Sequence, residues 1–340
     1  MTLPTTAQDD SRAVAASDEL VSVIIPCYNQ GQFLGEAIES LRGQSYRNFE
    51  VIVVDDGSTD NTQAIAARYS EVRTIRQDHA GTSTARNLGF RESNGNWLVF
   101  LDSDDRLLPH ALEIGLRNLR DRVECAFVFG RHQEITGDGT AVRTAPFVSI
   151  EKDPYGQLLL YNCVYTPSTA MFRRNLFEAV GGFDPRFLGA EDYDLYLRIA
   201  RRFPIFAYDE VVAEYRRHDA NYSGDNAQML RLCLGVMRKQ KQSVQENKEW
   251  KAAYHSGLSN WRKLWGEKLV SQVWSRVKRG KEWRRSARDM MVLLRYGPAV
   301  FPRQLGRKLL RPLRTALIPN GLQSLDLERR SLTAYKTPEQ

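Results

Sequence analysis

Short apolar runs alternate with segments of helical spacing in the first third of the chain. Four runs are rich in β-branched or aromatic apolar residues, as buried strands are. They are 21–26, 49–54, 72–76 and 97–101. Between them, apolar residues recur at helical spacing over 32–42, 60–69 and 83–93. This alternation predicts an α/β fold with a doubly wound, mostly parallel sheet.

The rest of the chain continues this pattern less clearly. We predict helices over 109–120, 155–163 and 192–202, and a strand over 125–130. The remaining residues between the strand at 125–130 and residue 165 give no clear pattern. Most of 227–340 has helical spacing, interrupted by prolines.

Charge divides the chain into two parts. Residues 1–225 hold 23 Lys and Arg against 33 Asp and Glu, whereas residues 226–340 hold 25 against 8, a net charge of +17. We therefore expect a disordered polar tail over 1–19, an α/β domain over 20–225 and a helical, basic extension over 226–340.

The four cysteines form no C-x-x-C pair, which favours a reducing compartment over a disulfide framework. No apolar run approaches the roughly 18–20 residues of a membrane span.

Acidic residues follow two of the predicted strands directly. Asp55 and Asp56 follow the second strand, and Asp102 and Asp104 follow the fourth. Ligands of such sheets bind outside the carboxyl ends of the strands. At this edge, carboxylates can meet a base, a ribose, or a divalent cation and the phosphates that it carries. Each pair can equally consist of ordinary turn or helix-cap residues.

Two later clusters add candidate residues. Glu191 and Asp192 stand at the start of a predicted helix, where Asp192 could deprotonate an acceptor hydroxyl or simply cap the helix. Arg216, Arg217 and His218 could stabilise a leaving diphosphate. His218 could also bind a metal, although a single histidine is more often structural.

Taken together, the motifs resemble those of family 2 glycosyltransferases, which have the GT-A fold. Seven segments match in the order and spacing of that family. They are VSVIIPCYN (21–29), VVDDGSTDNT (53–62), GTSTARNLGF (81–90), WLVFLDSDD (97–105), VGGFDPRF (180–187), AEDYDLYLR (190–198) and YRRH (215–218). The resemblance covers roughly residues 20–225, so this region would be the GT-A catalytic domain.

The resemblance implies a nucleoside pocket near the first strands. Pro26, Tyr28 and Asp55 would form this pocket, with Asp55 facing the base. Asp56 would line the pocket less directly. Arg86 would lie close to the nucleotide, although an isolated arginine is more often a surface cation.

The resemblance also implies the reacting groups. Asp102 would meet the ribose or the donor sugar and contribute to the metal site, and Asp104 would bind the metal with help from His218. Asp192 would be the general base, and Glu191 would shape the acceptor side. The sugar site would be lined by Gly182, Phe183 and Asp184.

The implied reaction is a metal-dependent, inverting transfer without a covalent sugar intermediate. The cofactor would be Mn²⁺ or Mg²⁺, and the donor a nucleotide sugar, with a UDP-sugar as the leading expectation. The acceptor would be a glycan or a lipid-linked hydroxyl. Processive synthases of this family add transmembrane helices and a Q-x-x-R-W motif, which this sequence lacks, so we expect single addition.

Two other classes of function compete with this one. A nucleotidyltransferase also uses acidic residues at strand ends with a metal, but the segments at 190–198 and 215–218 disfavour it. A non-catalytic adaptor could keep the fold and act through its basic helices. The full set of acidic motif residues argues against an adaptor.

The basic C-terminal region has an amphipathic pattern. Tryptophans and aliphatic residues of 258–278 lie near one helical face, and 303–314 continues the basic, apolar mixture. This pattern favours contact with an anionic membrane surface, which would make the protein cytoplasmic and peripheral on the inner face of the membrane. The alternative is that the tryptophans pack on the catalytic domain. No nucleic-acid-binding motif is recognisable, so we expect no nucleic-acid partner.

Overall fold

The structure is a computed structural model that describes residues 19–150, 152–218, 221, 224–280 and 282–298. The expected tail over 1–19, except for Glu19, and the basic stretch 303–314 lie outside these residues. The chain divides into two compact units, Met1–Trp261 and Arg262–Gln340. The first unit therefore continues well past residue 225, where the sequence suggested a boundary.

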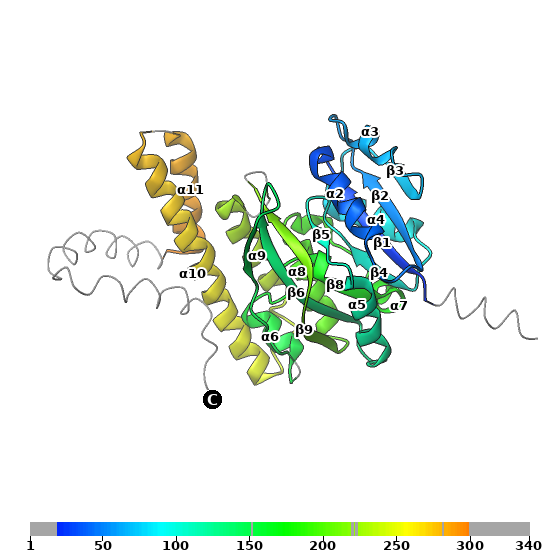
Figure 1. Ribbon diagram of the computed structural model, residues 1–340. Coiled ribbons are helices and arrows are strands. Elements are labelled where there is room, and N and C mark those ends of the chain that lie inside the picture. Colours follow the sequence, from blue (N-terminus) through cyan, green and yellow to red (C-terminus); the bar gives the residue numbers. More distant parts are fainter. Residues whose placement is uncertain (1–18, 151, 219–220, 222–223, 281, 299–340) are drawn as a thin grey trace, which may run out of the picture. The chain divides into compact units, whose positions relative to one another are not determined.

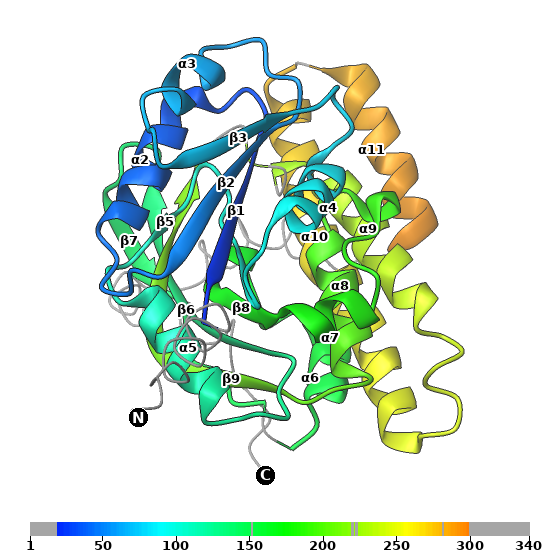
Figure 2. The ribbon, with the colours of Figure 1, turned by 90° about the vertical axis from the view of Figure 1, so that its right-hand side faces the viewer.

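In the described part of the chain, nine strands form one sheet (Figures 1 and 2). Their order is β3-β2-β1-β4-β8-β6-β9-β5, and β7 pairs with β6 at the side. The strands are β1 (Val21–Cys27), β2 (Phe49–Asp55), β3 (Val72–Arg76), β4 (Trp97–Phe100), β5 (Arg106–Leu107), β6 (Phe127–Thr136), β7 (Ala141–Thr144), β8 (Ala170–Arg173) and β9 (Ile205–Arg217).

Parallel and antiparallel strands divide the sheet. The predicted parallel half is present, because β3, β2, β1 and β4 all pair in parallel. Beyond β4 the sheet is mixed, since β8 is antiparallel to both β4 and β6 whereas β6 and β9 are parallel. The α/β class is thus confirmed, and the antiparallel pairs are a feature that the sequence analysis did not predict.

The predicted helices agree with the observed positions to within a few residues, and α7 is an additional helix that was not predicted. In the first unit they are α2 (Gly31–Arg42), α3 (Thr62–Ala66), α4 (Thr82–Glu92), α5 (Ala111–Arg120), α6 (Pro154–Leu160), α7 (Arg174–Ala179), α8 (Glu191–Ala200) and α9 (Asn226–Lys239). Two more helices follow. They are the long helix α10 (Lys248–Lys278), which crosses the division between the units, and α11 (Trp283–Tyr296).

Helices cover both faces of the parallel half (Figure 2). On one face, Leu34 and Ile38 of α2 join the same buried cluster as Val23 of β1, each side chain contributing roughly 2 kcal/mol by leaving water. On the other face α4 lies close to the sheet, because a Cβ on Gly89 would stand 2.4 Å from Cγ2 of Ile24. Packing on both sides explains why β1, β2 and β4 are nearly continuous apolar runs.

The second unit contains the end of α10 and all of α11. Arg276 of α10 donates to Asp289 of α11 at 2.5 Å, and Nε of Arg262 donates to the carbonyl oxygen of Tyr296 at 3.1 Å. These contacts hold the two helices antiparallel (Figure 1). None of the helices in the described residues has the length and apolar character needed to cross a lipid bilayer.

Candidate active site

The carboxyl ends of β2, β1 and β4 lie side by side and bring the acidic motifs to one edge of the sheet. The amide of Asp56 donates to the carbonyl of Cys27 at 2.9 Å, which joins the ends of β2 and β1. Oγ of Ser103 donates to Oε1 of Gln30 at 2.6 Å, which joins the turn after β4 to the loop after β1. The acidic turn at 102–105 is therefore fixed against the neighbouring loop.

Asp55 is fully buried at the end of β2 and is engaged by protein groups. Its carboxylate accepts from the amide of Ser58 at 2.8 Å and from Nη1 of Arg76 at 2.6 Å. Arg76 reaches it because the two residues are paired in register on neighbouring strands. Asp55 can thus meet a base only alongside Arg76, which the sequence analysis did not single out.

Asp56 organises the loop between β3 and α4. Its carboxylate accepts from the amides of Ala80 and Gly81, both at 2.8 Å, and lies 2.9 Å from Nδ1 of His79. The ring of His79 stacks on Tyr28 with centroids 3.9 Å apart. Tyr28 is 43% exposed, so the acids are covered by protein while an aromatic ring is accessible.

Arg86 occupies the centre of the site. It is only 4% exposed, and its guanidinium donates to Glu191 at 2.7 Å and to Asp102 at 2.5 Å. The ring of Phe183 lies beneath it, with Cζ 5.1 Å from the ring centroid. Burial alone would lower the pKa of Arg86, but the charges of Asp102 and Glu191 raise it overall. Arg86 therefore joins the end of β4 to the start of α8 and stays charged.

Asp192 lies in the first turn of α8, directly after Glu191. The N-cap of α8 is Ala190, so Asp192 does not cap the helix. Burial, followed by the negative charge of Glu191, raises the pKa of Asp192 to about 7, although Arg86 acts in the opposite direction. A carboxyl group that titrates near neutrality is suited to accept a proton.

Asp104 and His218 form a second polar pair. Nε2 of His218 is 2.9 Å from Oδ2 of Asp104, and the ring of His218 stacks on Phe33 with centroids 4.9 Å apart. Nδ2 of Asn221 donates to the same Asp104 oxygen at 3.3 Å. The pair thus brings the end of β9 to the acidic turn after β4.

Asp105, which was not predicted as a site residue, fixes this arrangement. It accepts from the hydroxyls of Ser168 at 2.8 Å and Thr166 at 3.1 Å, and from the amide of Arg216 at 3.0 Å. Burial, then the charges of Asp104 and Asp102, raises the pKa of Asp105. The sequence indicates these partners only through Thr166 and Ser168, two hydroxyl residues that stand two positions apart shortly before β8.

The expected metal ligands do not form one closed cluster. Over the described ranges, no three His, Cys, Asp or Glu residues are arranged to hold a metal ion by themselves. Asp104 and His218 are paired, whereas Asp102 is bonded to Arg86. Mg²⁺ commonly binds through one or two carboxylates together with substrate phosphates, so an open carboxylate–imidazole pair is compatible with a cation shared with a diphosphate.

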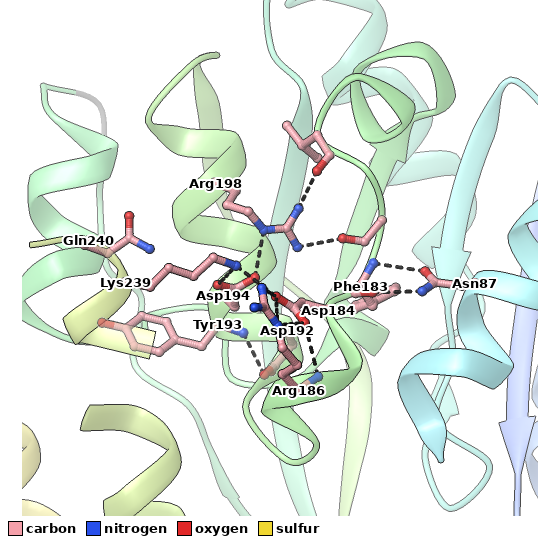
Figure 3. A network of polar contacts seen from close by, with 12 residues as sticks. Asn87, Phe183, Asp184, Arg186, Asp192, Tyr193, Asp194, Arg198, Lys239 and Gln240 are labelled. Carbon is pink, nitrogen blue, oxygen red and sulfur yellow. Dashed lines mark hydrogen bonds and ion pairs between the residues drawn. The ribbon is translucent and has the colours of Figure 1, made fainter. Parts of the chain in front are cut away.

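The loop at 182–184 supports α8. Phe183 is buried against Phe100, with ring centroids 4.9 Å apart, and its backbone is held by the side-chain amide of Asn87. Asp184 is bonded to Arg186 and Lys239 (Figure 3). The hydrogen bond from Arg186 is the largest influence on the pKa of Asp184 and lowers it. Burial acts in the opposite direction, and the hydrogen bond from Lys239 lowers the pKa further. The side chains expected to line the sugar site are thus engaged in the loop's own structure.

Lys239 also binds Asp194, which pairs with Arg198 at 2.7 Å (Figure 3). Arg198 in turn donates to the carbonyl of Gly182 at 2.6 Å. Next to Asp192, the hydroxyl of Tyr193 donates to the carbonyl of Leu158 at 2.7 Å. The same hydroxyl accepts from Nε1 of Trp261 at 3.2 Å. Helix α8 is therefore held from both α9 and α10.

Solved structures identify the fold. The mannosyltransferase PcManGT of Pyrobaculum calidifontis, in complex with GDP-Man and Mn²⁺, superposes with a TM-score of 0.57 at 20% identity, covering 87% of this chain and 82% of that one. S. aureus TarS 1–349 in complex with UDP-GlcNAc gives a TM-score of 0.51 at 19% identity, covering 73% and 82%. The chain has the GT-A fold.

Sequence comparison identifies the family. Residues 22–181 match the profile of Glycosyl transferase family 2. An uncharacterized glycosyltransferase of Rickettsia typhi is 31% identical, over 59% of this chain and 65% of the relative. The E. coli enzyme UDP-Glc:alpha-D-GlcNAc-diphosphoundecaprenol beta-1,3-glucosyltransferase WfgD is 29% identical, over 65% and 86%. E. coli chondroitin synthase is 30% identical, but the match spans only 30% of its length. Over residues 22–181 the chain thus matches the family 2 glycosyltransferases, and the same region matches relatives named glycosyltransferases.

Proposed function

We propose that this protein transfers one sugar from a nucleoside-diphosphate donor, preferably a UDP-sugar, to a hydroxyl of a glycan or lipid-linked acceptor. One observation carries the proposal. Buried Arg86 binds both Asp102 and Glu191, so the acidic turn after β4 and the carboxylate pair of α8 share one site. The UDP-GlcNAc and GDP-Man of the two solved structures, and the lipid-diphosphate acceptor in the name of WfgD, support these substrate classes.

The nucleoside half of the donor would bind at the ends of β1 and β2. Tyr28 offers an exposed ring on which a base can stack. Pro26 and Asp55 would shape the bottom of this pocket, and Asp56, which binds the amides of Ala80 and Gly81, would hold the loop at its side. The pairing of Asp55 with Arg76 presents a carboxylate and a guanidinium together, as suits the polar edge of a base.

The diphosphate half would bind a Mn²⁺ or Mg²⁺ ion at Asp104 and His218, near Asp102. When bound, such an ion would neutralise charge on the departing diphosphate as a Lewis acid. His218 and Asp104 are already held in contact by Asn221 and Phe33. These residues would therefore need little rearrangement to receive the ion.

Asp192 would accept the proton of the attacking hydroxyl. Its raised pKa near 7 gives it basicity while leaving a large ionised fraction at neutral pH. Attack from the side opposite the diphosphate would invert the anomeric configuration. Glu191, anchored by Arg86 and by the amide of Gly189, would shape the acceptor side without serving as the base.

The substitution Asp192→Asn tests this proposal. A positioned general base contributes about 10²–10⁴ in rate, so release of nucleotide from a UDP-sugar with Mn²⁺ and acceptor should fall by at least a hundredfold. Stabilisation of the variant by UDP and Mn²⁺ in thermal unfolding should persist, because the donor site is intact. Asp209→Asn, on the exposed part of β9, is the matched control and should keep full activity. Full transfer by the Asp192 variant would contradict the role of this residue.

The site of action would be the inner face of a membrane, with the protein bound peripherally. The net charge of +17 in residues 226–340 supports this placement, since anionic lipids attract basic segments. An acceptor carried on a lipid would be presented at the same surface.

A further inference from the structure

Helix α11 exposes a stripe of apolar side chains. Trp283 is 60% exposed, Met291 63% and Leu294 58%, and Ala287 between them is exposed as well. Their spacing of four, four and three residues places them on one face of the helix. Large apolar side chains gathered in this way, rather than scattered singly, indicate a binding surface.

The opposite face of α11 already has its own partner. Val292 and Leu293 are buried, and Asp289 is bonded to Arg276 of α10. The apolar stripe is therefore not a core face left open within this pair of helices. It is a second apolar face on a helix that is already packed.

The tryptophans of α10 do not provide such a surface. Trp261 and Trp265 are buried, as are Leu269 and Val273 on the same side of the helix. This side of α10 is therefore already packed, and Trp261 donates to the hydroxyl of Tyr193 in the same unit. Among the described side chains of residues 226–340, the exposed large apolar ones are Leu264 on α10 and Trp283, Met291 and Leu294, which gather on α11.

Arginines adjoin the stripe along its length. Arg284, Arg288 and Arg295 are exposed and occupy the sector of α11 next to the one that holds Trp283, Met291 and Leu294. An apolar band beside a cationic band is the arrangement of helices that lie in the plane of a bilayer interface. The arginine side chains would reach anionic headgroups while the indole ring of Trp283 lies at the same depth.

We propose that α11 binds the surface of an anionic phospholipid bilayer, with Trp283, Met291 and Leu294 inserted and the three arginines at headgroup level. Charge complementarity selects this partner, because a neutral apolar partner would make no ionic contacts with the three arginines. This surface is independent of the donor site, so its failure would leave the glycosyltransferase proposal untouched.

Vesicle flotation of the full-length protein tests the proposal. The native protein should float with vesicles of phosphatidylcholine and phosphatidylglycerol, and much less with phosphatidylcholine alone. The triple variant Arg284→Gln, Arg288→Gln, Arg295→Gln should partition on the order of a hundredfold more weakly, at about fivefold for each arginine. The triple variant Trp283→Ser, Met291→Ser, Leu294→Ser should also lose at least about tenfold. Higher salt should weaken binding of the native protein.

Val123→Ser with Val142→Ser is the matched control, because both valines are exposed in the first unit, and it should float as the native protein does. Circular dichroism checks that each variant folds, as substitutions of exposed side chains should allow. Equal flotation of the native protein and either triple variant would overturn the proposal and point instead to another segment, such as 299–340. Failure of the native protein to float, or equal binding to neutral vesicles, would overturn it too.

Discussion

Replacing Arg86 by methionine should destabilise the protein and should do so in a pH-dependent way. Methionine keeps much of the volume but removes the cation between Asp102 and Glu191. Removing one partner of a buried ion pair costs about 3–5 kcal/mol, because the remaining charges stay buried and uncompensated. In a chain of this size, we therefore expect the melting temperature to fall by about 10 °C at pH 7.5.

The pH dependence follows from the carboxyl groups that remain. Burial raises the pKa of Asp102, and burial with the charge of Glu191 raises that of Asp192, while Arg86 lowers both. A carboxyl group with a raised pKa in the folded state favours folding in its protonated form, so it destabilises the fold as pH rises. Without Arg86 these groups protonate more readily. The difference in melting temperature between the native protein and the variant should therefore shrink as the pH falls from 8 towards about 5.

Thermal unfolding of the native protein and the variant at several pH values measures this effect. Arg117→Met is the matched control, because Arg117 forms an exposed ion pair with Glu210 at 3.1 Å. Such a surface pair is worth about 0–1 kcal/mol, so the control should change little at any pH. The central role of the buried cation would be refuted if Arg86→Met lost no more melting temperature than Arg117→Met. It would also be refuted if the loss were the same at pH 5 and pH 8.

Three further outcomes follow from the site. The rate of the native enzyme at saturating donor should rise with pH through about 7, since Asp192 must be ionised to act, and a profile flat from pH 5.5 to 8.5 would contradict this. His218→Ala should raise the Mn²⁺ concentration for half-maximal activity by about tenfold or more, whereas exposed His255→Ala should leave it unchanged. Gly182→Ala should cost about 1–3 kcal/mol in unfolding free energy, because φ is +68° and the new Cβ would stand 2.6 Å from Oδ1 of Asn87. Gly35→Ala is its control, and equal stability of the two variants would exclude strain at residue 182.

Most of the parallel half of the fold could be predicted from sequence, because three of its strands, β1, β2 and β4, are largely buried. Each of β1, β2 and β4 is a short apolar run, which is a local signal. Strand β9 was not predicted, because Asp209 and Glu210 interrupt its apolar pattern where its register with β6 shifts. The antiparallel strand β8 has only four residues, too few for a reliable period.

In the candidate site, too, residues that directly follow a strand could be predicted, whereas contacts between distant parts of the chain could not. The acidic residues at the ends of β2 and β4 could be located from sequence, because the strands before them are evident. The partners of these acids could not, since Arg86 and Glu191 lie 105 residues apart and are joined only by the folded chain. For this reason the ion pairs of Arg86 with Asp102 and Glu191 were not predicted, whereas its place near the nucleotide stays a prediction.

The bonds of the Tyr193 hydroxyl define how much of the chain an active fragment needs. The residue beside Asp192 is anchored to Leu158 and to Trp261, and Trp261 lies 80 residues beyond the end of the family match at residue 181. A fragment cut at the end of that match would lose α8 itself, and one cut at residue 225 would leave this hydroxyl without its indole donor. A fusion of this protein to another one should therefore keep the chain through at least Trp261.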